Sequence, residues 1–147
     1  MAQEFLTTFI EDIKSVTLVP SETGGRYTIF VDDNTEGEGI LLDSVPFNAQ
    51  IGILGHEFAH ILDYEQRNSG NMIGLGLNYL TEDGKMKLEK QTDYSTISKG
   101  LGWQLYDWSD FVLNKSNASE KYKTYKRKFY LQPIEIEAEI KKNPWYK

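Results

Sequence analysis

The segment from Asn48 to about Gln66 has the periodicity of one long helix, and it contains the only two histidines of the chain. Asn48 is a suitable N-cap residue. The large apolar side chains recur at three- and four-residue steps and share one face, namely Ile51, Leu54, Phe58, Ile61 and Leu62. Gly52, Gly55 and Ala59 form a separate stripe of small residues. The segment therefore predicts a helix with one apolar face and a second face to which another element can approach closely.

Both histidines lie near the side opposite the apolar stripe, within the sequence Gly-His-Glu-Phe-Ala-His at residues 55–60. Because His56 and His60 are four residues apart, their rings project from the same side of successive turns and can converge on one zinc ion. Glu57 lies one residue round the helix, where its carboxylate can take a proton from a metal-bound water without being a ligand. This HExxH pattern predicts a zinc-dependent hydrolase. The alternative is that both histidines are packing or hydrogen-bonding residues of a buried helix.

A catalytic zinc site needs a third protein ligand. Where a metzincin has its last ligand, six residues after His60, this chain has Gln66, so that subclass is disfavoured. Further along, the sequence Glu-Lys-Gln-Thr-Asp at residues 89–93 places two carboxylates four residues apart on one helical face. In this combination the chain resembles the gluzincins, the thermolysin-like zinc metallopeptidases, in which an ExxxD helix follows the HExxH motif.

The resemblance implies that Glu89 is the third zinc ligand. It also implies that Asp93 holds a zinc-bound histidine, His56, through the outer nitrogen of its ring. Asp63 lies near the histidine face, and we expect it to orient a ligand or to cap the helix. If Glu89 does not bind the ion, the reserve candidates for the third ligand are Asp63, Glu65 and Glu82.

The residue that stabilises the oxyanion of the reaction is left open. With both histidines used as ligands, a tyrosine or Arg127 has to donate the hydrogen bond. The tyrosine candidates are Tyr94, Tyr122, Tyr125 and Tyr130. Each of them could instead be a core aromatic, and the sequence does not choose among them.

We expect an α+β fold of the zincin-like kind, as one domain over residues 1–147. A small twisted, mostly antiparallel sheet would pack on the active-site helix, and a helical C-terminal half would follow. The strands are predicted by β-branched and aromatic runs at Val16–Val19, Tyr27–Val31 and Ile40–Leu42. The glycine-rich residues 67–85 predict a loop that contains one short helical or extended piece. Further helices are expected from about Lys87 to Lys99 with Gly100 as a stop, from Gly102 to Leu113, from Ser119 and from Pro133.

Charge and composition exclude several other functions. The formal charge of −6 repels phosphate backbones, so nucleic acid is not expected as a partner. Without cysteine, any transition-metal site has to use histidines and carboxylates. No apolar run approaches the length of a membrane span, and the start of the chain lacks the pattern of a signal peptide. The chain as given is expected to be soluble. Its abrupt start would also suit a secreted or periplasmic protein trimmed at the N-terminus.

The expected activity is cleavage of a peptide or protein substrate by a zinc-activated water, with Glu57 as general base. The resemblance also implies that Ile40–Asp43, just before the motif helix, is the sheet edge that binds an extended substrate. Two alternatives remain. One is a zinc-binding protein of the same fold without turnover. The other is an interaction module that uses the basic, aromatic segment Lys121–Tyr130.

Overall fold

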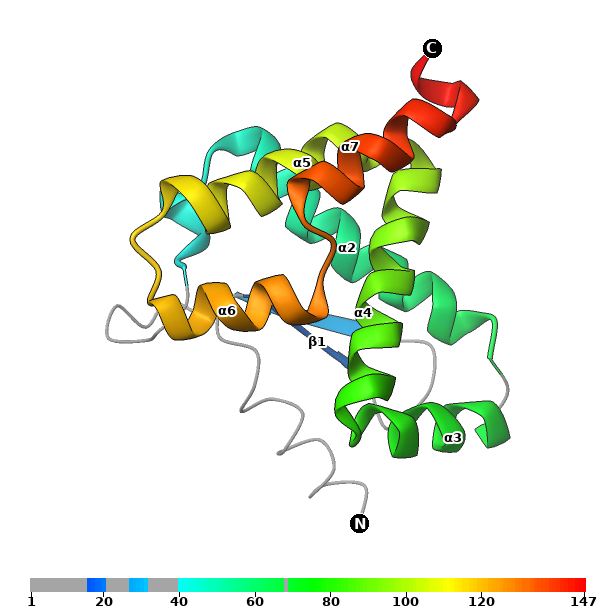
Figure 1. Cartoon of the computed structure of the whole chain (residues 1–147). Helices are drawn as coiled ribbons and strands as arrows, with labels where there is room; N and C mark the ends of the chain where they lie inside the picture. The colour runs from blue at the N-terminus through cyan, green and yellow to red at the C-terminus, as the bar shows by residue number, and fades with distance from the viewer. Residues whose placement is uncertain (1–15, 21–26, 32–39, 68) are drawn as a thin grey trace.

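Helices make up most of the described chain, which comprises residues 16–20, 27–31, 40–67 and 69–147 of a computed structural model (Figure 1). The α-helices are α2 (Phe47–Glu65), α3 (Ser69–Tyr79), α4 (Glu82–Thr96), α5 (Gly102–Asp110), α6 (Glu120–Phe129) and α7 (Pro133–Lys142). Strands β1 (Val16–Pro20) and β2 (Tyr27–Val31) pair antiparallel, with Val16 opposite Val31. None of the helices in these ranges combines the length and apolarity needed to cross a lipid bilayer.

The expected α+β, zincin-like fold is wrong. Within the described residues the sheet has only the two strands β1 and β2, and the architecture is mainly helical. The third strand expected at Ile40–Leu42, and with it the substrate-binding edge at Ile40–Asp43, does not form. Instead Leu42–Ser44 makes one turn of 3₁₀ helix, in which the amide and the hydroxyl of Ser44 both donate to the Leu41 carbonyl. Ile40 and Val45 are buried in the core, so this short apolar run is used for packing rather than for a β-ladder.

The loop expected at residues 67–85, with one short helical or extended piece, is also wrong in extent, because most of this segment is helical. It forms α3 and the first turn of α4, which begins at Glu82 rather than near Lys87. Thr81 is the N-cap of α4, and its side chain accepts a hydrogen bond from the amide of Gly84. The four glycines of the segment are therefore tolerated within helices rather than ending them.

Several expected helix boundaries are confirmed. Gly100 has φ of 91° and separates α4 from α5, as expected for a glycine in the left-handed region. The hydroxyl of Ser119 accepts from the amide of Tyr122 at 3.1 Å and caps α6. Pro133 is the first residue of α7.

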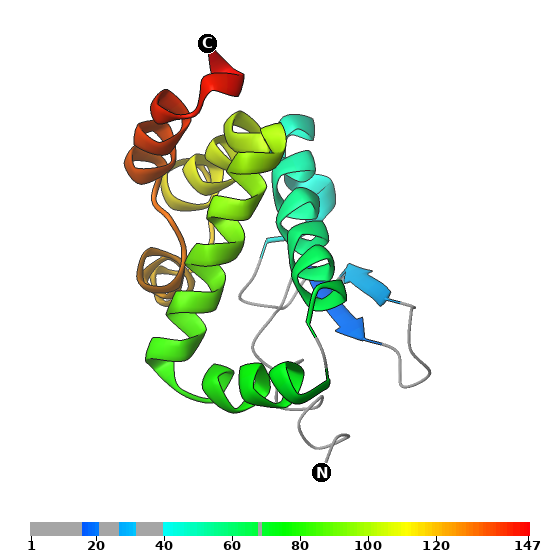
Figure 2. The same ribbon diagram turned by 90° about the vertical axis from the view of Figure 1, so that its right-hand side faces the viewer.

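Figure 2 shows α2 and α4 running side by side, with the two strands beyond α2 and with α3 crossing between the ends of the two helices. The buried face of α2 is its small-residue and histidine side, whereas Phe58 and Leu62 of the apolar stripe are 55% and 44% exposed. The expected close approach occurs at Gly52, where a Cβ would lie 2.1 Å from the carbonyl oxygen of Gln104 on α5. The histidines are therefore carried on the face of α2 that is held between α4 and α5.

We expect Gly52→Ala to lower the free energy of unfolding by about 1–3 kcal/mol or more, because its methyl group would overlap the backbone of α5. Urea unfolding measures this loss. Gly74→Ala is the matched control, since a Cβ at Gly74 in α3 meets nothing within 4 Å. There the same substitution should stabilise the protein by about 0.5–1 kcal/mol. Equal effects at both positions would contradict the close approach of α2 and α5.

Candidate metal centre

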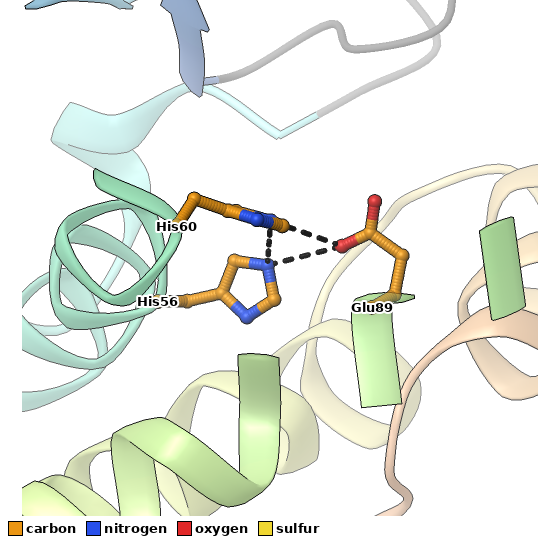
Figure 3. A group of neighbouring side chains, drawn as sticks. All are labelled: His56, His60 and Glu89. Carbon is orange, nitrogen blue, oxygen red and sulfur yellow. Dashed lines mark hydrogen bonds and ion pairs between the residues drawn. The ribbon is translucent and has the colours of Figure 1, made fainter. Parts of the chain in front are cut away.

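Three buried side chains from α2 and α4 converge on one point (Figure 3). The Nε2 atoms of His56 and His60 lie 3.1 Å apart. Glu89 Oε2 lies 3.1 Å from Nε2 of His56 and 3.4 Å from Nε2 of His60. The three residues are 2%, 6% and 2% exposed, respectively. Three potential electron-pair donors thus face one another out of water, an arrangement that needs a proton or a cation among them.

The spacing of these donor atoms fits a small tetrahedral cation. With zinc bonds of about 2.0–2.1 Å, ligand atoms at tetrahedral angles are about 3.4 Å apart. The three observed separations, 3.1, 3.1 and 3.4 Å, are close to this value. Two imidazoles and one carboxylate are also the donor set of a family of catalytic zinc sites that keep a fourth position open. The residues present therefore fit zinc both in chemistry and in spacing.

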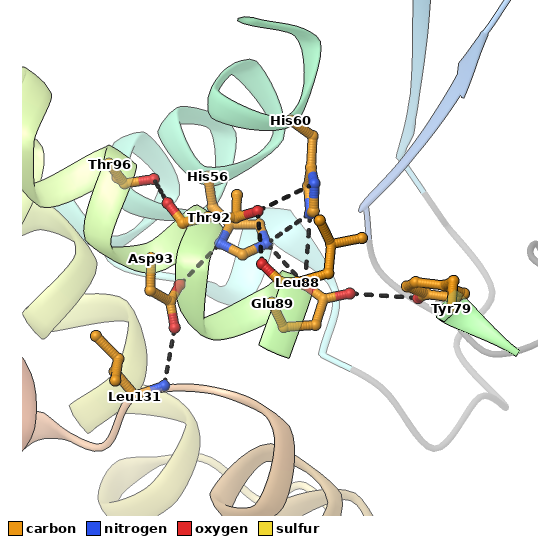
Figure 4. A network of polar contacts seen from close by, with 9 residues as sticks. All are labelled: His56, His60, Tyr79, Leu88, Glu89, Thr92, Asp93, Thr96 and Leu131. Carbon is orange, nitrogen blue, oxygen red and sulfur yellow. Dashed lines mark hydrogen bonds and ion pairs between the residues drawn. The ribbon is translucent and has the colours of Figure 1, made fainter. Parts of the chain in front are cut away.

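The outer nitrogen of His56 faces a second carboxylate on α4. His56 Nδ1 lies 2.8 Å from Asp93 Oδ1, and Asp93 is 1% exposed. The other oxygen of Asp93 accepts a hydrogen bond from the amide of Leu131 at 2.8 Å (Figure 4). The segment between α6 and α7 thereby fixes Asp93, and Asp93 in turn fixes the ring of His56.

Two polar contacts at the site involve residues that the sequence analysis missed. Tyr79, at the end of α3, donates to Glu89 Oε1 at 3.3 Å, so the two oxygens of Glu89 have different partners. The hydroxyl of Thr92 lies 3.2 Å from His60 Nδ1. Thr92 is three residues from Glu89 and one from Asp93, so it shares their helical face, and that spacing could have identified it. Nothing in the sequence around Tyr79 indicates its contact with Glu89.

Glu57 is buried beside the three converging residues but is not one of them. It is 6% exposed, and its carboxylate makes no hydrogen bond to any residue in the described ranges. Burial raises the pKa of Glu57, while its electrostatic interaction with the neighbouring histidines opposes this shift. Its carboxylate is therefore left available for chemistry rather than used for folding contacts.

Among the oxyanion candidates, Tyr130 is the one whose ring contacts a histidine of the cluster. Its centroid lies 5.5 Å from that of His56. Burial, and then the negative charge of Glu89, raise the pKa of Tyr130 well above its usual value, so its hydroxyl stays protonated. Tyr125 lies beside Tyr130, with ring centroids 6.2 Å apart.

The remaining oxyanion candidates face elsewhere. Tyr94 is 47% exposed. Arg127 is an exposed residue 3.6 Å from the carboxylate of Glu120, and Tyr122 packs under the ammonium group of Lys126. A further tyrosine, Tyr64 on α2, was missed although it follows His60 by one helical turn. It is 8% exposed, and its ring stacks on that of His60 with centroids 5.9 Å apart.

The reserve ligand candidates are all engaged outside the cluster. Both oxygens of Asp63 accept from Arg67, at 2.6 and 3.0 Å. Glu65 accepts from the hydroxyl of Tyr27 at 2.6 Å. Glu82 pairs with Lys128 at 2.6 Å. Asp63 does not contact either histidine among the described interactions, so the role expected for it as an orienting group is not seen. It pairs instead with Arg67, which follows the C-terminal end of α2.

We expect the metal-free protein to lose stability as the pH rises from 6.5 toward about 10. Burial lowers the pKa of His56, but hydrogen bonds to Asp93 and Glu89 outweigh it and raise that pKa from 6.5 to about 10. Since the folded state holds the proton more tightly, this stabilisation is complete below pH 6.5 and is lost as the pH rises through about 10. Urea unfolding in the presence of a chelator measures the loss.

His56→Gln is the control for this pH dependence, since glutamine cannot take up the proton. Its unfolding free energy should change less over the same pH range. With zinc present the trend should reverse, because the ion has to displace the proton from His56 and binds more tightly as the pH rises. A metal-free wild type whose stability increases toward alkaline pH would contradict the proton assignment.

Comparison with protein-family models, with curated proteins and with solved structures found no match to this chain.

Proposed function

We propose that this chain is a zinc-dependent hydrolase, specifically a metallopeptidase related to the gluzincins through its two motif helices. The proposal rests on one observation, the convergence of His56, His60 and Glu89 within 3.1–3.4 Å of one another in a buried site. These three residues would hold the ion. The predicted zincin-like sheet is no part of this proposal, because the described fold is mainly helical.

A zinc ion bound by these residues would supply a Lewis acid that acidifies a water molecule and polarises a substrate carbonyl. Glu57 is the general base in this proposal. Its carboxylate is buried next to the histidines, and burial raises its pKa, which makes it a stronger base for the proton of the water. Glu57 would accept the proton of the attacking water and later pass it to the leaving amine.

Tyr130 would donate a hydrogen bond to the carbonyl oxygen as negative charge develops there. Its ring lies against His56, and its hydroxyl makes no hydrogen bond to any residue of the described ranges. A neutral donor in a buried site stabilises developing charge more strongly than water does. Tyr64, whose ring stacks on that of His60, is the second candidate for this donor.

We expect Tyr130→Phe to lower the turnover number by about 10²- to 10³-fold, as removal of one oxyanion donor does in other hydrolases. Zinc content should be unchanged, because Tyr130 contacts the ring of His56 and not the three donor atoms. Tyr94→Phe, at a 47% exposed position, is the control and should retain full activity. Full activity of Tyr130→Phe would show that another residue donates to the oxyanion, and Tyr64→Phe would be the next variant to test.

The proposal as a whole is tested with the purified protein. It should contain about one zinc per chain, hydrolyse casein or a mixed peptide library, lose that activity on chelation and regain it when zinc is restored. A protein that binds zinc without hydrolysing any peptide would be the non-catalytic alternative. For the interaction-module alternative, three basic residues of α6 already have partners within the chain. Arg127, Lys128 and Lys123 contact Glu120, Glu82 and the Ser116 carbonyl, respectively.

A further inference from the structure

The two histidines of the cluster have different partners for their outer ring nitrogens. His56 Nδ1 faces the carboxylate of Asp93 at 2.8 Å, whereas His60 Nδ1 faces the hydroxyl of Thr92 at 3.2 Å (Figure 4). Thr92 is 4% exposed, and its hydroxyl also lies 3.0 Å from the carbonyl oxygen of Leu88, one turn back on α4. The resemblance to the gluzincins assigns a role to Asp93 but none to Thr92.

The contacts of Thr92 determine where the proton of His60 lies. A hydroxyl has one proton, and a carbonyl oxygen can only accept a hydrogen bond. When Thr92 donates to Leu88, its oxygen remains free to accept from a protonated Nδ1 of His60. The lone pair of neutral His60 is then on Nε2, which faces Nε2 of His56 and the carboxylate of Glu89. The opposite tautomer would place a proton at the point where the three donor atoms meet.

We propose that Thr92 is a positioning residue for His60. Its hydroxyl holds His60 in the Nδ1-protonated tautomer, so that Nε2 of His60 faces the metal ion. The inference rests on the zinc site of the proposed function, but it is separate from catalysis. A neutral hydroxyl orients the ring without adding a third carboxylate beside Glu89 and Asp93. The negative charges of those two residues already balance a divalent cation.

The neighbouring Thr96 provides a matched control on the same helix. It is 1% exposed, and its hydroxyl donates to the carbonyl of Thr92 at 2.9 Å, the same back-bond that Thr92 makes to Leu88. Its hydroxyl contacts neither histidine among the described residues. Thr92→Val and Thr96→Val therefore remove the same group and the same kind of helix contact, and only the first removes a partner of His60. Thr92→Ser keeps the hydroxyl.

The first measurement is the zinc affinity of the full chain, by competition with a chromophoric chelator. Thr92→Val should bind zinc about 10- to 100-fold more weakly than the wild type, the loss typical of residues that orient a metal-bound histidine. Thr96→Val and Thr92→Ser should bind as the wild type does. Wild-type affinity in Thr92→Val, or an equal loss in Thr96→Val, would overturn the role of Thr92.

The second measurement is the tautomer itself, from the ¹⁵N chemical shifts of the imidazole nitrogens of His60 in the metal-free protein. The wild type should show a protonated Nδ1, and Thr92→Val should show a mixture of both tautomers. A wild-type His60 protonated at Nε2 would overturn the proposal even if Thr92→Val failed to fold. If the wild type bound no zinc, the proposed function would fail, while these shifts would still decide the tautomer.

Discussion

Glu57→Gln is expected to lower the turnover number by about 10²- to 10⁴-fold, the contribution typical of a general base, without loss of zinc. Glutamine has the size of glutamate but cannot accept a proton at neutral pH. In the described structure Glu57 makes no hydrogen bond and is not among the three donor residues, so its replacement should not disturb the site. The measurements are hydrolysis of a fluorogenic peptide and zinc content of the same sample.

Glu65→Gln is the matched control for this prediction. It is the same substitution on the same helix, at an exposed residue that accepts a hydrogen bond from Tyr27, and it should leave turnover unchanged. Two outcomes would contradict the assignment of Glu57. Full activity of Glu57→Gln with zinc retained would show that another group moves the proton. Loss of zinc from Glu57→Gln would make Glu57 a ligand rather than a base.

The sequence predicted the convergence of the site residues because that convergence depends on local helix geometry. His56 and His60 are one turn apart on α2, and Glu89 and Asp93 are one turn apart on α4. A period of 3.6 residues fixes which side chains share a face, whatever the rest of the chain does. Only the contact between the two helices depends on tertiary structure. The small residues of α2 indicated that another element could approach one face of this helix closely.

The sheet was overpredicted because short apolar runs do not distinguish a strand from buried irregular chain. The run at residues 40–42 is apolar because Ile40 is a core residue, not because it pairs in a ladder. The loop at residues 67–85 was overpredicted for a related reason. Glycine lowers helix propensity by about 1 kcal/mol per residue, but tertiary packing overrides such a preference. Here α3 packs against α4, and its last residue, Tyr79, contacts Glu89.

The residues that the sequence did not identify are those whose role depends on contacts between elements. Tyr79 reaches Glu89 from α3, in a segment expected to be mostly loop. The backbone amide of Leu131 reaches Asp93 from the segment between α6 and α7, and a backbone donor leaves no signature in the side-chain pattern. Motif spacing therefore identifies the groups that would bind the ion, whereas the groups that hold them in place become visible only in the folded chain.

Glu89→Ala is expected to cost more zinc affinity than the roughly 10- to 100-fold loss typical of a residue that only orients a ligand. The substitution removes one of the three donor atoms, since Glu89 Oε2 lies within 3.4 Å of both histidine Nε2 atoms. With only the two imidazoles left, two of the four positions around the zinc ion would be open to water. An ordinary catalytic zinc site has three protein ligands and one open position. Zinc content after dialysis and competition with a chelator measure the loss, and hydrolysis should fall with it.

Glu82→Ala, on the same helix, is the control, and it also tests a competing ligand. Glu82 is exposed and pairs with Lys128 at 2.6 Å, so its removal should leave zinc in place. If Glu82→Ala lost zinc and Glu89→Ala kept it, the third ligand would be Glu82, and α4 would have to bind the ion with its first turn. That would be incompatible with the distances between Glu89 and the two histidines. Loss of zinc in Glu89→Ala alone is the result that these distances require.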